Sequence, residues 1–157
     1  PGIADASEAS DNFGASLAWG DFDGDGYDDL AAGISGENPS GVAGAGAVAV
    51  LYGSGTGLSG AGSQLWHQNS PGILDLAEID DHFGASLASG DADGDGYADV
   101  VIGVPEENVG AVADAGVINV LYGSASGLAS GGNQVWHQNS PGIADAAEAS
   151  DRFGAAL

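Results

Sequence analysis

The sequence contains no cysteine and no methionine, and Arg152 is its only lysine or arginine among 157 residues. Without cysteine, the chain has neither a disulfide framework nor a zinc site with thiolate ligands. No apolar run approaches the roughly 18 residues of a membrane-spanning helix, so we expect no membrane insertion. No basic and then apolar signal region opens the chain. Because the chain begins at Pro1 and lacks methionine, we expect a processed or excised piece of a longer protein.

Acidic residues dominate the charge of the chain. Asp and Glu number 23, and the formal net charge is −22. Such a chain repels nucleic acids and anionic membrane surfaces, which excludes them as partners and leaves cations as natural ligands. The 43% of hydrophobic residues fall in short regular runs, which argues against a disordered acidic tail, and the 29 glycines favour a tightly turned β architecture.

A repeat of 70 residues organises the sequence. Phe13-Gly14 recurs at Phe83-Gly84 and again at Phe153-Gly154, and residues 1–70 and 71–140 are identical at 41 aligned positions. Residues 141–157 match residues 1–17 at 14 positions. The chain therefore consists of one repeat over 1–70, a second over 71–140 and the beginning of a third over 141–157.

Each repeat predicts four short strands separated by glycine-rich turns. In the first repeat they are Phe13 to Gly20, Leu30 to Ile34, Ala45 to Tyr52, and Gln64 to Gln68. A long segment then crosses to the next repeat, which predicts an all-β fold of β-propeller blades, each a four-stranded antiparallel sheet: two blades plus the start of a third. A parallel β-helix has far shorter repeats and is disfavoured.

Two blades cannot close a propeller ring, which typically needs about four to eight. We therefore expect other copies of this chain, or a tandem array, to complete the ring. Because residues 141–157 repeat residues 1–17, they could complete a neighbouring blade or be swapped between chains. A monomeric mass in light scattering would count against such a homo-oligomer.

The pattern D-x-D-x-D-G-x-x-D occurs between the first and second strands of both repeats. Its first, third and fifth carboxylates can converge if the chain curls, the glycine permits the curl, the seventh residue offers a carbonyl and the ninth another carboxylate. Hard oxygen ligands in this number suit calcium, so we predict one Ca2+ per repeat and two in total. The predicted metal ligands are Asp21, Asp23, Asp25, Tyr27 and Asp29, and in the second repeat Asp91, Asp93, Asp95, Tyr97 and Asp99.

Two other interpretations of these loops are less favourable. An EF-hand requires a glutamate at the twelfth position and flanking helices, but that position holds Ala32 and Ile102 within β-type runs. A metal-free acidic turn would leave four neighbouring carboxylates to repel one another. Filling both sites would change the net charge from −22 to about −18.

The Phe-Gly pairs, the Asp-rich hairpins and Gly103-Val104-Pro105 resemble the FG-GAP repeat of integrin α-subunit propellers and their bacterial relatives, over essentially the whole chain. The resemblance implies a calcium-binding role for the loop on the rim of the propeller. The first repeat departs from the pattern, with Gly33-Ile34-Ser35 where proline is expected. The period is longer than in animal integrins and is more similar to bacterial members.

Other candidate sites are weaker. The acidic segment Asp5-Glu8-Asp11 recurs at 75–81 and 145–151, and we interpret it as a solvated connector in preference to a second cation site or a glycosidase-like carboxylate pair. Trp-His-Gln-Asn at 66–69 and 136–139 is expected to pack on the outer strand, not to line a ligand pocket. A G-x-G-x-x-G match at 55–60 is absent from the second repeat and precedes no helix, so it is a chance match.

The sequence contains no G-x-S-x-G, no nucleophilic cysteine and no H-E-x-x-H motif, so we predict that the chain is not an enzyme. We predict a calcium-binding, non-catalytic propeller module for extracellular adhesion or recognition of a protein or glycan, with Ca2+ as a structural clip. The alternatives are a self-assembling repeat that forms a ring or array and an accessory propeller of a secreted enzyme. Because such loops need abundant calcium, we expect a secreted or cell-surface location.

Overall fold

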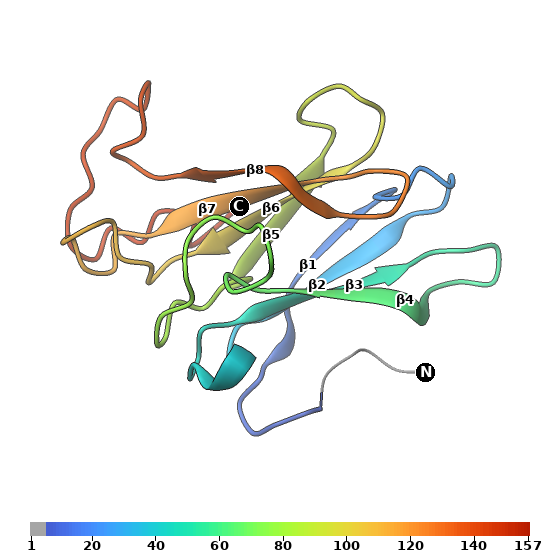
Figure 1. Ribbon diagram of the computed structural model, residues 1–157, viewed down its shortest axis with the longest axis horizontal. Helices are drawn as coiled ribbons and strands as arrows, with labels where there is room; N and C mark the ends of the chain where they lie inside the picture. Colours follow the sequence, from blue (N-terminus) through green and yellow to red (C-terminus); the bar gives the residue numbers. More distant parts are fainter. Residues whose placement is uncertain (1–5) are drawn as a thin grey trace.

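The computed structural model describes residues 6–157, which form two four-stranded antiparallel sheets with the strands in sequence order (Figure 1). The only helix in this part of the chain is a single 3-10 turn, Pro39–Gly41. This arrangement confirms the predicted all-β fold of propeller blades. The first blade comprises β1 (Phe13–Gly20), β2 (Asp29–Ile34), β3 (Ala47–Tyr52) and β4 (Ser59–Trp66), and the second comprises β5 (Ser86–Gly90), β6 (Asp99–Val104), β7 (Val117–Tyr122) and β8 (Ala129–Trp136).

In the first blade β1 has the predicted bounds, β2 begins one residue earlier and β3 two residues later than predicted, and the largest difference is in β4. This strand begins at Ser59, not at Gln64, because it pairs with β3 from Ser59 opposite Tyr52 onward. The register shifts between Val50 and Tyr52. The segment 59–63 is rich in glycine, alanine and serine, which have little intrinsic preference for strands, so its pairing comes from the neighbouring strand.

The main apolar core lies between the two blades. Val48 and Val50 of β3 pack in one cluster with Val100, Val104 and Leu121 of the second blade, and all five are completely or almost completely buried. The first strands of the two blades, β1 and β5, are also joined, because the Ser89 hydroxyl donates a hydrogen bond of 2.5 Å to the carbonyl of Trp19. Adjacent first strands and stacked sheet faces are the arrangement of neighbouring blades in a propeller.

The second Phe-Gly pair joins its own blade to the preceding one. Phe83 is completely buried, and its N–H donates to the carbonyl of Ala45 at 2.8 Å. Gly84 lies so close to Gly33 of β2 that a Cβ on Gly33 would lie 2.1 Å from the Gly84 carbonyl oxygen. The Phe-Gly pair is therefore a contact between blades.

The beginning of the third repeat makes the same contact with the second blade. Phe153 donates its N–H to the carbonyl of Ala115 at 2.8 Å, and Ser150 donates to Ala113 at 3.0 Å. The Gly154 carbonyl accepts a hydrogen bond of 2.5 Å from the Ser86 hydroxyl. Exchange of this segment between chains stays a prediction. Within residues 6–157 no helix is long and apolar enough to cross a membrane.

Candidate metal centres

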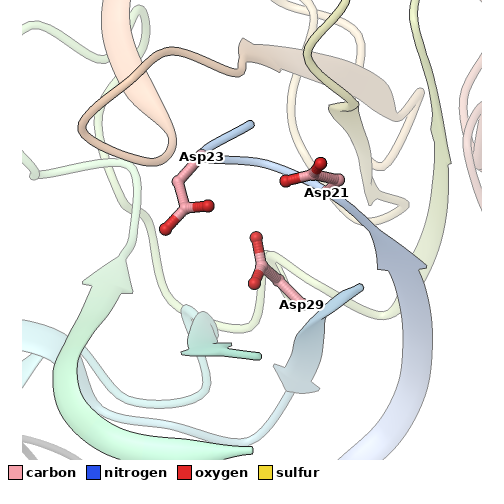
Figure 2. Close-up of side chains that lie close together, drawn as sticks. All are labelled: Asp21, Asp23 and Asp29. Carbon is pink, nitrogen blue, oxygen red and sulfur yellow. The ribbon is translucent and has the colours of Figure 1, made fainter. Parts of the chain in front are cut away.

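Three carboxylates converge at the loop between β1 and β2. Asp21, Asp23 and Asp29 each offer an oxygen, and these oxygens lie within 4.8 Å of one another. Figure 2 shows the three side chains directed toward one space, with Asp29 approaching from the side opposite Asp21 and Asp23. The second repeat forms the same group, within the same distance, from Asp91, Asp93 and Asp99.

The loop is wrapped around the carboxylate of Asp21. Its Oδ1 accepts hydrogen bonds from the N–H groups of Gly24 at 2.7 Å and Asp25 at 3.0 Å, and its Oδ2 accepts from Gly26 at 2.9 Å. Gly24 and Gly26 have φ values of +74° and +90°, a region that residues with a Cβ rarely adopt. The glycines thus allow the turn that directs backbone donors toward the first aspartate.

Asp29 connects this loop to the end of β3. It is completely buried, and its two oxygens accept hydrogen bonds from Phe22 N–H at 2.8 Å and from Gly53 N–H at 2.7 Å. Burial raises the pKa of Asp29 above its usual value, and the two backbone hydrogen bonds oppose that rise. Asp99 makes the corresponding bonds in the second blade, at 2.7 and 2.9 Å.

The fifth and seventh residues of the pattern lie outside the groups of three. Asp25 is exposed, and its Oδ1 accepts a hydrogen bond of 2.9 Å from Tyr27 N–H. Asp95 and Tyr97 form the same short turn, again at 2.9 Å. The structure brings together three of the predicted ligands in each loop, and metal binding by Asp25, Tyr27, Asp95 and Tyr97 stays a prediction.

The donor set and its spacing fit calcium. Two oxygens bound to one calcium ion at roughly 2.3–2.6 Å lie at most about 5 Å apart, and the observed oxygens lie within 4.8 Å of one another. Among residues 6–157 no lysine or arginine reaches these loops, because the only such residue, Arg152, lies 3.6 Å from Glu106. A divalent cation would therefore be the counter-charge that the loops lack.

Phe22 in the first loop makes a contact between the blades that the sequence pattern did not predict. Its side chain is completely buried, and its carbonyl accepts a hydrogen bond of 3.1 Å from Ser124 N–H of the second blade. The adjacent carbonyl of Asp21 accepts a second bond, from Ala98 N–H at 2.9 Å. The second repeat has Ala92 at the equivalent position. A large apolar side chain in the first loop alone was the sequence feature that could have indicated packing against another blade.

Stacked four-stranded blades with acidic loops define a class of protein, the β-propeller built from repeats that each carry an acidic hairpin. The family model for the FG-GAP repeat matches residues 13–51 and 83–121. The chain belongs to the FG-GAP repeat family, which confirms the resemblance found in the sequence.

The chain is similar to parts of much longer curated proteins. Integrin alpha-PS2 of Drosophila melanogaster is 31% identical over 157 residues, which cover 97% of this chain and 10% of the relative. Phosphatidylinositol-glycan-specific phospholipase D is 32% identical in Rattus norvegicus, over 71% of this chain and 13% of the relative, and 30% identical in Bos taurus, over 73% and 14%. The chain thus spans 10% to 14% of the length of these relatives.

Proposed function

We propose that this chain is a calcium-binding, non-catalytic propeller module for extracellular adhesion or recognition. The observation that supports this function most directly is the gathering of three carboxylates in each β1–β2-type loop, without a positive side chain beside them. Membership of the FG-GAP family and similarity to an integrin α chain support the same function. A protein or glycan is the expected partner, and the abundance of calcium outside cells favours an extracellular or cell-surface location.

Calcium would act as a structural clip. An ion held by Asp21, Asp23 and Asp29 would join the loop to the start of β2, and Asp29 already connects that point to Gly53 after β3. Since the same loop packs on the second blade through Phe22, fixing the loop would also strengthen the contact between blades. Metal binding would in this way add to the stability of two small sheets.

Thermal unfolding with and without calcium tests the proposal. A site filled to about 100 times its dissociation constant adds about 2.7 kcal/mol, and for this chain length 1 kcal/mol corresponds to about 2–4 °C. Two filled sites should therefore raise Tm by roughly 10–20 °C in millimolar calcium relative to excess chelator. The double variant Asp23→Asn/Asp93→Asn should lose the part of the effect that the two loop sites contribute, whereas Asp28→Asn, at an exposed position that is Ala98 in the second repeat, should keep it. Equal Tm values in calcium and chelator would overturn the proposal.

A second candidate is an accessory propeller of a secreted enzyme. The similarity to part of phosphatidylinositol-glycan-specific phospholipase D supports this alternative. Sequencing the full gene distinguishes the two functions, because an accessory propeller is encoded together with a catalytic domain. A catalytic domain in the same chain would favour the accessory role. Binding of the isolated chain to a glycan array, dependent on calcium, favours recognition.

A third candidate is assembly with further blades, from other copies of this chain or from a tandem array. Phe13 and Leu17 of β1 are 53% and 52% exposed, whereas their counterparts in the second repeat, Phe83 and Leu87, are 0% and 8% exposed against the first blade. The first blade thus presents the type of surface that another blade covers. Light scattering should detect concentration-dependent assembly that Leu17→Asp abolishes, and a monomer at all concentrations would refute this role.

A further inference from the structure

A third group of carboxylates lies between the two blades, outside the Asp-rich loops. Glu78, Asp81 and Glu107 each offer an oxygen, and these oxygens lie within 4.8 Å of one another. Asp81 is 1% exposed and Glu107 is 2% exposed. The prediction that the acidic connectors are solvated is therefore wrong for Asp81, because the connector folds its last carboxylate into the contact between the blades.

Separate segments of the chain build this inter-blade cluster. Glu78 and Asp81 belong to the connector, which is held by a hydrogen bond of 2.5 Å from Glu78 N–H to Asp81 Oδ2. Glu107 follows β6 of the second blade, and its carbonyl accepts a hydrogen bond of 2.9 Å from Gly116 N–H. Asn108 donates to Glu78 Oε2 at 2.6 Å. The positions of the carboxylates are thus fixed by the fold on both sides.

A buried glutamine from the first blade is directed into the cluster. Gln68, which follows β4, is 2% exposed, and its amide contacts Glu107 Oε2 at 2.5 Å through Nε2. Its Oε1 has no hydrogen-bond partner among residues 6–157. Leaving a buried amide oxygen without a hydrogen bond is unfavourable, and a cation within reach of the amide would remove that cost by accepting the oxygen as a ligand.

We propose that Glu78, Asp81, Glu107 and Gln68 form a third cation site, which holds a divalent cation of the calcium type between neighbouring blades. All candidate ligands are oxygens, which suits a hard cation, and the spacing within 4.8 Å again fits calcium. Carboxylates can bind calcium through one or both oxygens, whereas magnesium requires a small regular octahedron. The ion would join blade to blade, unlike the loop sites, whose ligands come from a single blade.

The equivalent residues elsewhere in the repeats do not form such a cluster, which indicates that the site needs two complete blades. Gln138, the counterpart of Gln68, is only half-buried; its Oε1 is likewise without a hydrogen-bond partner, but within residues 6–157 its amide donates no hydrogen bond to a carboxylate, as Gln68 does to Glu107. The first repeat places Asp11 and Glu37 in buried positions, but they are not part of a group of three within that spacing in the described chain. Gln138 therefore provides a matched control for Gln68.

Counting bound calcium in the full chain tests the site. After dialysis against millimolar calcium, we expect Glu107→Gln to bind about one ion fewer than the wild type, and Asp80→Asn to bind the same number as the wild type. Asp80 is exposed and next to Asp81, so its substitution removes the same charge without touching the cluster. Asp23→Asn/Asp93→Asn should remove two other ions independently, which separates failure of the loop sites from failure of this one. A calcium count in Glu107→Gln equal to that of the wild type overturns the inter-blade site, whatever the loops bind.

If circular dichroism shows that Glu107→Gln does not fold, a second pair of variants still tests the proposal. Even outer-shell partners of a metal site contribute roughly 10- to 100-fold in affinity, so Gln68→Leu should weaken calcium binding at one site at least about tenfold in calorimetric titration. Gln138→Leu, in the same sequence context, should leave the titration unchanged. Identical titrations for Gln68→Leu and the wild type refute the site.

Discussion

Replacing Asp29 by alanine isolates the metal-independent part of the loop's stability. Both oxygens of this completely buried carboxylate accept backbone hydrogen bonds, from Phe22 at 2.8 Å and Gly53 at 2.7 Å. Hydrogen bonds to charged groups contribute about 1.5–3 kcal/mol each, and the substitution also leaves both donors without a partner. We therefore expect Asp29→Ala to lower the free energy of unfolding by about 3–5 kcal/mol even in chelator, a large share of the ~5–15 kcal/mol of a typical domain.

Urea unfolding followed by tryptophan fluorescence measures this loss. Asp28→Ala is the matched control, because Asp28 is exposed and the second repeat has Ala98 at the same place. In chelator the control should stay within about 0.5 kcal/mol of the wild type. Calcium should widen the difference between Asp29→Ala and the control, since the substitution also removes a ligand. Equal stabilities for the two variants in chelator would refute the reasoning, because they would mean that the two hydrogen bonds contribute nothing.

Three further substitutions test other parts of the structure. Asn119 is completely buried, and neither polar atom of its side chain is hydrogen-bonded within the described part of the chain. Asn119→Leu should therefore raise the free energy of unfolding by about 1–3 kcal/mol, and a loss of stability would contradict this. Gly33→Ala should lower the free energy of unfolding by about 1–3 kcal/mol or more, because the new Cβ would lie 2.1 Å from the carbonyl oxygen of Gly84. The control Gly90→Ala, whose Cβ would meet no described atom within 4 Å, should leave the free energy of unfolding nearly unchanged in the same urea assay. Burial raises the pKa of Glu107 from 4.5 to about 8. The native state therefore holds more protons than the unfolded state between these values, and calcium-free stability should fall as the pH rises through this window. Glu107→Gln should lose this dependence in chelator, and an unchanged pH profile would contradict the assignment.

The sequence was sufficient to predict the blade architecture and the two acidic loops. Repetition every 70 residues identified the blade, and D-x-D-x-D-G-x-x-D identified the loops, because both signals are local in the chain. Of the predicted ligands, Asp21, Asp23 and Asp29 meet because Gly24 and Gly26 turn the backbone and direct N–H groups onto Asp21. These determinants lie within nine consecutive residues, so a pattern can carry them.

The contacts between blades could not be predicted from a local pattern. Gln68 and Glu107 are 39 residues apart and meet through the stacking of the blades. Asp81 belongs to a segment whose composition resembles a solvated connector, yet it is 1% exposed. Phe22 and Ala92 occupy equivalent loop positions but differ in their surroundings. A repeat pattern predicts what equivalent positions share, whereas burial between blades depends on which neighbour each blade has.

The scarcity of basic residues explains how these carboxylates are held. With 23 acidic residues and one arginine, the chain cannot neutralise its buried carboxylates by ion pairs. Backbone N–H groups hold the carboxylates in place instead, by hydrogen bonds: three are donated to Asp21, two to Asp29 and one to Asp81. Amide dipoles orient a carboxylate and lower the cost of its burial, but they carry no net charge, so repulsion within each group of three remains. A fold that positions its acids with backbone amides should therefore gain stability from cations in solution, and the places where we propose that they bind are the three groups whose carboxylate oxygens lie within 4.8 Å of one another.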